Sequence, residues 1–154
     1  MPNPSIGSPY IQNYSKSQYK AGNQNWSITQ DKEGLIYTAN NEGLLVYDGA
    51  NWELYPLSNK KHLRSVALAP NGNIYVGGKE EFGFFQKKDG KLLYNRISDH
   101  VKPSLLENDE IWKILFLEDA IIFQAFSKLY IYKNNKIEIQ YGNGEPFLFA
   151  HQIG

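Results

Sequence analysis

The twelve residues Trp26–Tyr37 (WSITQDKEGLIY) recur twice further along the chain, as an internal repeat. The second copy is Arg64–Tyr75 (RSVALAPNGNIY), and the third is Trp112–Phe123 (WKILFLEDAIIF). Their first residues lie 38 and then 48 positions apart. A repeat of this length, in which apolar and polar residues nearly alternate, indicates units built from β-strands rather than from helices.

Each unit contains four short strand patterns separated by turn residues. They lie around residue 28 and at 35–37, 43–47 and 52–55, then at 64–69, 73–77, 82–86 and 91–97, then at 111–117, 120–126, 129–133 and 136–141. Glycine and asparagine between these runs supply the positive φ angles that tight hairpins require. Four strands in a unit of about 40 residues predict an all-β fold made of β-propeller blades.

The repeat divides the chain into about three blades with partial blades at both ends. The expected segments are an N-terminal part with a candidate closing strand (1–25), blade 1 (26–57), blade 2 (62–98), an enlarged loop with room for a short helical turn (99–110), blade 3 (111–142) and the start of a fourth blade (146–154). Propellers need about 4–8 blades to close, and exposed sheet edges pair readily with other chains. We therefore expect a fragment, and a homodimer through the blade edges is a hypothesis.

Composition excludes several classes of partner. Sixteen basic and sixteen acidic residues cancel, whereas nucleic-acid binding normally leaves a basic footprint; no nucleic-acid partner is expected. The chain has no cysteine, so it has no disulfides, which leaves the compartment open. No apolar run approaches the roughly 20 residues that span a bilayer, and Met1–Pro4 lacks the pattern of a signal peptide.

The order of motifs in the first unit resembles the two-component regulator propeller repeat. That repeat has a small apolar strand, an Asp-x-x-Gly turn, an aromatic strand, a Gly-Leu strand, a Tyr-Asp-Gly turn and a tryptophan, matched here at 27–28, 31–34, 36–37, 43–44, 47–49 and 52. The opening residues 13–14 and 22–26 are similar to the start of sensor proteins from Bacteroidetes-type bacteria. As a departure, Pro70 replaces the turn aspartate in the second unit.

This resemblance implies the N-terminal blades of a hybrid two-component or triple-tyrosine-domain sensor protein. It implies a periplasmic or otherwise extracytoplasmic module that senses a ligand, such as a glycan, or that mediates dimerisation. The membrane helix and the kinase or DNA-binding output region of such proteins have no counterpart in this chain.

Candidate ligand-binding residues are those expected on the face where the inner strands begin and the second and third strands are joined. They are Asn25, Trp26, Asn40, Asn41, Glu42, Arg64, Glu80, Glu81, Trp112 and Phe126. Aromatic faces with amides and carboxylates suit sugars, because rings cover apolar faces and polar groups bind hydroxyls. Competing interpretations are that the two tryptophans pack between blades, that Asn40 and Asn41 satisfy a turn, and that the glutamates lie in a solvated loop.

Catalytic signatures are missing from the sequence. There is no Gly-x-Ser-x-Gly elbow or P-loop, and the three histidines lack metal-ligand spacing. We therefore expect a non-catalytic module with no metal and no cofactor. Two alternatives stay open. A fragment of a carbohydrate-active enzyme, a glycosidase or lyase, would need convergent carboxylates, which Glu42, Glu80 and Glu81 could supply. A purely structural dimerisation scaffold would have a featureless channel entrance.

Overall fold

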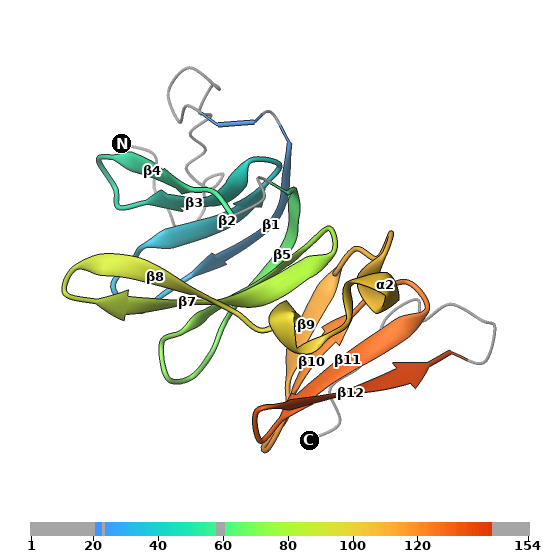
Figure 1. Cartoon of the computed structure of the whole chain (residues 1–154). Helices are drawn as coiled ribbons and strands as arrows, with labels where there is room; N and C mark the ends of the chain where they lie inside the picture. The colour runs from blue at the N-terminus through green and yellow to red at the C-terminus, as the bar shows by residue number, and fades with distance from the viewer. Residues whose placement is uncertain (1–20, 23, 58–60, 143–154) are drawn as a thin grey trace, which may run out of the picture.

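The computed structural model describes residues 21–22, 24–57 and 61–142, which form three four-stranded antiparallel sheets (Figure 1). Each sheet is one blade with its strands in sequence order. Blade 1 consists of β1 (Asn25–Gln30), β2 (Ile36–Asn40), β3 (Gly43–Tyr47) and β4 (Trp52–Tyr55). Blade 2 consists of β5 (Leu63–Leu68), β6 (Ile74–Gly78), β7 (Glu81–Lys88) and β8 (Lys91–Arg96). Blade 3 consists of β9 (Lys113–Phe116), β10 (Ile121–Gln124), β11 (Lys128–Lys133) and β12 (Lys136–Tyr141).

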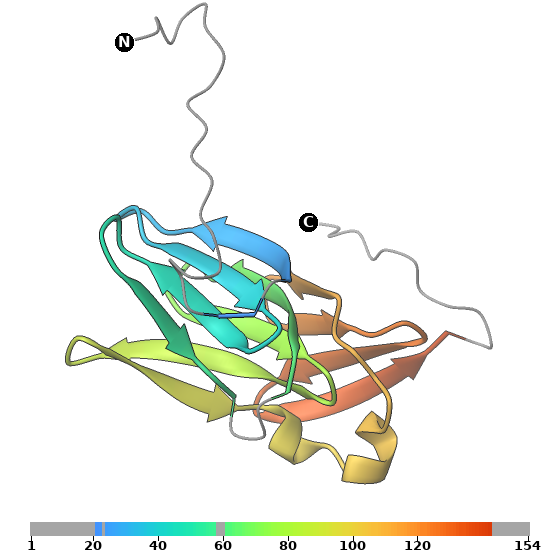
Figure 2. The ribbon, with the colours of Figure 1, turned by 90° about the horizontal axis from the view of Figure 1, so that it is seen from above.

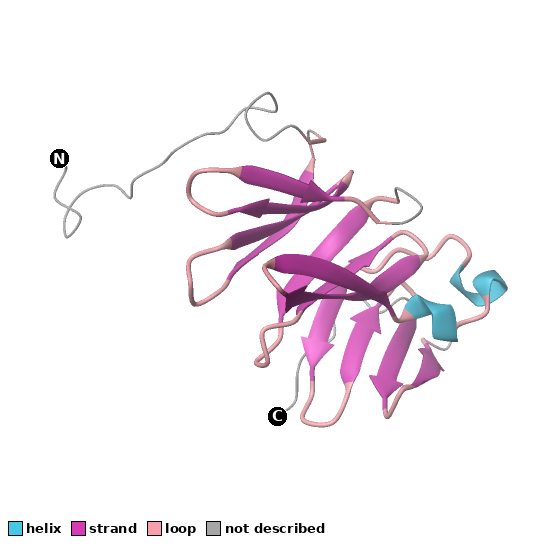
Figure 3. Cartoon of the chain, turned by 60° about the vertical axis from the view of Figure 1, so that its left-hand side comes forward, coloured by secondary structure: helices cyan, strands magenta, loops and turns pink. Residues whose placement is uncertain are grey.

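The three sheets confirm the prediction of an all-β fold with propeller blades. The segment between blades 2 and 3 carries a 3-10 turn, η1 (Ser98–His100), and one short helix, α2 (Pro103–Leu106). Figure 3 shows both at one end of blades 2 and 3. The fourth blade expected at 146–154 and most of the N-terminal segment 1–25 lie outside the described residues.

Local turn chemistry explains why the strands end where they do. In the β1–β2 turn, Asp31 Oδ1 accepts hydrogen bonds from the backbone N–H groups of Glu33 and Leu35, each at 2.9 Å. Gly34 takes φ +92° in this turn, a conformation that L-residues with a side chain rarely adopt. Asn134 and Asn135 take φ 52° and 60° in the β11–β12 turn, which asparagine tolerates better than most residues.

Two hydrophobic clusters hold neighbouring blades together face to face. The cluster between blades 1 and 2 contains Tyr37, Ala39, Leu44, Leu57, Leu63, Val66, Ile74, Val76 and Phe85. The cluster between blades 2 and 3 has a group of aromatic rings within it: Phe82 stacks on Phe123 with ring centroids 4.4 Å apart and contacts Tyr130 at 5.3 Å. Blade 2 therefore lies between the other two and contributes to both cores (Figure 2).

The inner strands β1, β5 and β9 run beside one another and bring their first residues close together. Ser65 Oγ on β5 donates to the carbonyl oxygen of Ile111 at 2.9 Å, just before β9. Gly77 on β6 is required here, because a Cβ at this position would collide with the side chain of Ile111. This close approach aligns the starts of blades 2 and 3.

The insert between blades 2 and 3 (residues 98–110) is tied to blade 3 by partly buried polar contacts. The hydroxyl of Tyr130 donates to the carboxylate of Asp109 and, at 3.1 Å, to the carbonyl oxygen of Leu105. Lys128 Nζ donates to the same carbonyl at 2.6 Å and pairs with Asp109 at 3.1 Å. Burial and the Asp109 carboxylate both raise the pKa of Tyr130, so its hydroxyl stays protonated and available to donate.

Candidate functional site

Two β-bulges lie at the second residues of the inner strands β1 and β5. The register of β1 against β2 shifts between Asn25 and Ser27, so Trp26 is the extra residue. The register of β5 against β6 shifts in the same way between Leu63 and Ser65, which makes Arg64 the extra residue. A bulge leaves one residue out of the ladder and turns its side chain away from the regular alternation. Both side chains therefore depart from the regular alternation of their strands.

The equivalent residues of all three blades meet at this point. The rings of Trp26 and Trp112 contact edge to face, with centroids 5.8 Å apart and planes at 76°. The guanidinium carbon of Arg64 lies 4.5 Å from the centroid of Trp26 and 5.5 Å from that of Trp112. The cation is therefore held by two aromatic rings, an arrangement favoured by their negative faces. We call Trp26, Arg64 and Trp112 the axial cluster.

A polar frame fixes the axial cluster from blade 1. The side-chain oxygen of Asn41 accepts hydrogen bonds from Trp26 Nε1 at 2.7 Å and from Arg64 Nη1 at 3.0 Å. The amide nitrogen of Asn41 in turn donates to Gln24 Oε1 at 2.7 Å. One amide thus orients both an indole and the guanidinium, which leaves the ring faces in a defined position.

A carboxylate from the insert compensates the charge of Arg64. Glu110 Oε1 lies 3.1 Å from Arg64 Nε, although off the N–H direction, so the contact is an ion pair rather than a directed hydrogen bond. The arginine side chain is only 11% exposed, whereas Glu110 is 29% exposed. The carboxylate is therefore nearer to solvent than the cation that it neutralises.

Much of each indole faces solvent in spite of these contacts. Trp26 is 43% exposed and Trp112 is 46% exposed. The tryptophans were interpreted as packing residues or as surface available to a ligand. Each interpretation agrees with part of the observed geometry. They pack on each other and on Arg64 across blades, and they still present aromatic surface at the start of the inner strands.

Asn40 and Asn25 lie beside the axial cluster, and their side chains bond to each other and, from Asn40, to the backbone. Asn40 is fully buried; its amide nitrogen donates to the carbonyl oxygen of Gly22 and to Asn25 Oδ1, each at 2.8 Å. Its side-chain oxygen accepts from the backbone N–H groups of Gly22 at 3.0 Å and Glu42 at 2.9 Å. Asn40 therefore shapes the β2–β3 turn, and the side chain of Glu42 is exposed at that turn.

The structure does not bring Glu80, Glu81 or Phe126 into the axial cluster. Glu80 pairs with Lys61 at 3.0 Å and accepts from the backbone N–H of Asn108 at 2.8 Å; this N–H and then Lys61 lower the pKa of Glu80. Glu81 is 0% exposed, with its nearest charge, Arg96 Nε, 3.7 Å away. Phe126 is 62% exposed beyond the end of β10.

Glu110 and Gln24 are site residues that sequence reasoning missed. Gln24 and Glu110 each lie two residues before the first residue of a repeat unit, and His62 holds the same position before Arg64, but the three side chains differ in chemical type. The feature of the sequence that could have identified Glu110 as a site residue is its position two residues before Trp112. That position alone does not reveal an ion pair to a residue 46 positions earlier.

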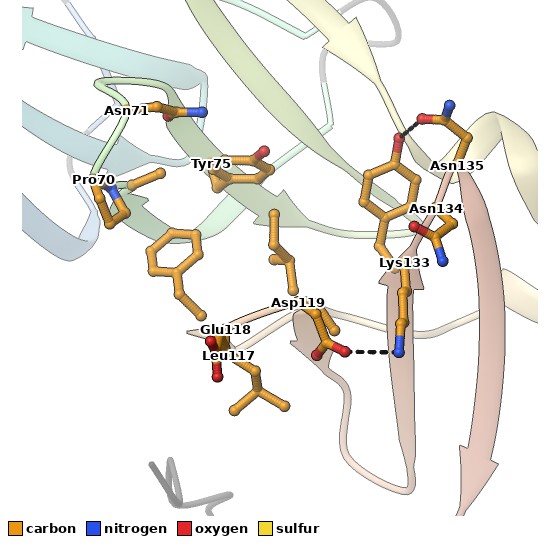
Figure 4. A pocket seen from close by; sticks show the side chains of 14 residues that line it. Pro70, Asn71, Tyr75, Leu117, Glu118, Asp119, Lys133, Asn134 and Asn135 are labelled. Atoms are coloured by element: carbon orange, nitrogen blue, oxygen red, sulfur yellow. Dashed lines mark hydrogen bonds and ion pairs between the residues drawn. The ribbon is translucent and has the colours of Figure 1, made fainter.

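A separate hollow lies between blades 2 and 3 at the other end of the inner strands (Figure 4). It has a volume of about 460 Å³ and is walled by Tyr75, Phe116 and Tyr132. Lys133 and Asp119 pair across its rim at 2.7 Å. Comparable hollows between blades 1 and 2 are lined by repeat-equivalent turn residues and by Lys87. This recurrence indicates a consequence of blade packing rather than a dedicated site.

In residues 21–22, 24–57 and 61–142, no three histidine, aspartate or glutamate side chains are grouped so as to hold a metal. None of the helices in the same residues is long and apolar enough to cross a membrane.

The three blades with an axial cluster at the starts of their inner strands define the class of this chain, a β-propeller segment. Virginiamycin B lyase from Staphylococcus aureus is similar, with a TM-score of 0.61 and 13% identity over 80% of this chain and 44% of that one. YCF48 from Cyanidioschyzon merolae gives a TM-score of 0.56 and 12% identity over 79% and 41%. The extracellular domain of BT4673 from B. thetaiotaomicron, assigned to a hybrid two-component system, gives 0.58 and 18% over 79% and 16%.

These similarities show the fold alone, since all three identities are low. The chain spans less than half of the length of each of these proteins. No family model and no curated protein sequence matches it. Structural likeness to a two-component sensor domain agrees with the propeller fold implied by the sequence resemblance, and membership of that repeat family stays a prediction.

Proposed function

We propose that this chain is the ligand-binding part of an extracytoplasmic sensor propeller in a bacterial signal-transduction receptor, and that the axial cluster contacts the ligand, a glycan. The observation that carries the proposal is the convergence of two half-exposed indoles from different blades, fixed by Asn41 and Arg64. Likeness in fold to the extracellular domain of BT4673 supports the sensor context.

The chemistry of the axial cluster suits the apolar face of a sugar ring. Indole rings bury large areas without losing much conformational entropy, because few torsions are fixed when they bind. Trp26 and Trp112 are already held by their neighbours, so that little ordering is needed when a ligand arrives. Amide groups of Asn41 and Gln24 lie next to the rings and provide polar partners for hydroxyl groups at the edge of the site.

The test is binding of soluble oligosaccharides to the 154-residue chain, with chitotetraose, cellotetraose and xylotetraose as probes and tryptophan fluorescence and calorimetry as readouts. We expect Trp112→Ala and Trp26→Ala each to weaken binding at least about 10-fold, which corresponds to about 1.4 kcal/mol. Trp52→Phe is the matched control, because Trp52 stacks on Tyr47 in blade 1, away from the cluster. Binding that survives both alanine substitutions, or no binding to any probe, would argue against glycan recognition here.

The enzyme alternative has less support from the arrangement of carboxylates. It needs Glu42, Glu80 and Glu81 to converge, whereas Glu81 is fully buried beside Arg96 and Glu80 is engaged by Lys61 and Asn108. Glu42 lies on the β2–β3 turn of blade 1. A homodimer through the blade edges is a separate proposal. Light scattering tests it by giving the absolute mass in solution, and a monomeric mass would exclude the homodimer.

A further inference from the structure

We propose that Glu110 is a specificity-determining residue, which makes the axial cluster selective for uncharged ligands and against anions. This inference rests on the proposed ligand-binding function of the cluster. It assigns a role to the insert between blades 2 and 3, which the repeat itself does not explain.

The polar groups of Arg64 are engaged by the chain's own residues. Nε lies 3.1 Å from Glu110, Nη1 donates to Asn41 at 3.0 Å, and Nη2 lies 3.4 Å from His62 Nδ1. The guanidinium carbon also lies over the rings of Trp26 and Trp112, at 4.5 and 5.5 Å from their centroids. An anionic ligand therefore has to compete with Glu110, Asn41 or His62 for the guanidinium nitrogens.

The backbone holds Glu110 in place for this role. Lys79 and Glu110 form an antiparallel bridge between the β6–β7 turn and the insert. On either side of it, the N–H of Glu80 donates to the carbonyl oxygen of Asp109 at 2.7 Å, and the N–H of Ile111 donates to that of Gly78 at 3.0 Å. The backbone that carries Glu110 is thus fixed beside Arg64 by two main-chain hydrogen bonds, in addition to the ion pair of its side chain.

Which charge a ligand meets first depends on the relative exposure of Glu110 and Arg64. Glu110 is more exposed than Arg64, so an approaching anion meets a carboxylate first and a cation second. Like charges brought together disfavour the wrong partner, which is a common source of specificity. An uncharged sugar that stacks on the indoles is not repelled by Glu110 and does not have to displace a partner of Arg64. Removing the carboxylate charge should turn the same cluster into a site that attracts anions.

The first experiment needs no identified ligand. In a Trp52→Phe background, only Trp26 and Trp112 remain as tryptophans, and their quenching by iodide reports the local potential. At low ionic strength we expect Glu110→Gln to raise the Stern–Volmer constant for iodide about twofold and leave quenching by neutral acrylamide unchanged, with the difference lost in high salt. Glu107→Gln is the matched control, because it makes the same charge change in the insert without an ion pair to Arg64. Equal responses of the two variants, or none, would overturn the proposal.

The second experiment separates this inference from the proposed function. Chitotetraose is uncharged, and a hyaluronan tetrasaccharide has a carboxylate on alternate sugars. We expect the unmodified chain to prefer the neutral sugar at least about 10-fold, and Glu110→Gln to reduce that preference several-fold by improving binding of the acidic one. Failure of the unmodified chain to bind either sugar counts against glycan binding, while the iodide result still decides the role of Glu110. A preference unchanged in Glu110→Gln overturns that role.

Discussion

Asp31 links the turn of blade 1 to the neighbouring blade through both of its carboxylate oxygens. Oδ1 caps the turn, and Oδ2 accepts from the hydroxyl of Tyr37 at 2.8 Å and from Lys87 Nζ at 2.9 Å. The side chain is 8% exposed. Burial alone would raise the pKa of Asp31, but hydrogen bonds from Lys87, Tyr37 and Leu35 outweigh it and lower the pKa.

At the residue scale, we expect Asp31→Asn to destabilise the fold by about 1–3 kcal/mol at pH 7, because an amide nitrogen then faces two donors. A lowered carboxyl pKa contributes stability above its ordinary value of 3.8, and this contribution is lost as the pH falls through the folded-state value. Urea unfolding of both proteins between pH 7 and pH 3 should therefore show the difference shrinking below about pH 4.

The control for this prediction is Glu33→Gln. Glu33 also lies near Lys87, at 3.5 Å, but its side chain is 75% exposed, so its loss should cost no more than about 1 kcal/mol. A stability difference for Asp31→Asn that stays constant down to pH 3 would show that the ion pair does not carry the effect.

The sequence alignment predicted which residues lie at equivalent places in the blades. It did not predict in which direction the side chains of neighbouring residues point. Trp26, Arg64 and Trp112 share one repeat position, so their grouping on one face followed from the alignment. Glu80 and Glu81 are adjacent carboxylates, yet Glu80 takes the turn with φ 57° and Glu81 is the first, fully buried residue of β7. A one-residue difference in where the turn falls decides which of them faces inwards.

At the scale of elements, strands were predictable because their signals are local. Alternation of apolar residues and turn residues such as Gly34 and Asn134 mark hairpins within a few positions. The insert was harder to predict, since its helix α2 has four residues (Pro103–Leu106) and depends on distant partners in blade 3. Contacts such as that of Tyr130 with Leu105, 25 positions apart, leave no pattern in the sequence.

The insert provides a second prediction. Tyr130→Phe removes the hydroxyl that binds Leu105 and Asp109, and should lower global stability by about 1–2 kcal/mol, because a hydrogen bond to a carboxylate is lost and only Lys128 still contacts both acceptors. We expect hydrogen exchange in residues 102–110 to accelerate more than elsewhere, since local opening there becomes easier. Tyr132→Phe is the control, because its hydroxyl contacts exposed Asn135. Similar exchange in both variants would contradict an anchoring role for Tyr130.

At the scale of the whole molecule, blade 2 contributes to both hydrophobic clusters and couples the outer blades. Phe82 lies in the cluster with blade 3, whereas Phe85, three positions on along β7, lies in the cluster with blade 1. Repeat proteins derive much of their stability from such interfaces between neighbours. Blades 1 and 3 should therefore unfold together although their cores are separate.

A variant in the second cluster tests this coupling. We expect Phe82→Leu, which shortens the stack on Phe123, to cost about 1–2 kcal/mol as a core substitution. Trp52 reports on blade 1 and Trp112 on blade 3, so single-tryptophan versions follow each blade. Their urea midpoints should coincide and shift equally in Phe82→Leu. A midpoint that falls for Trp112 alone would show blades that unfold independently.

The bulges at Trp26 and Arg64 have a consequence for how such a molecule diversifies. Each bulged side chain stands outside the ladder, so the same backbone accepts an indole in blade 1 and a guanidinium in blade 2. Variation at these positions exchanges one side chain of the axial cluster for another, and neither position belongs to the hydrophobic clusters between the blades. The composition of the axial cluster can therefore change by one substitution in blade 1 or blade 2 without altering the residues of the hydrophobic clusters.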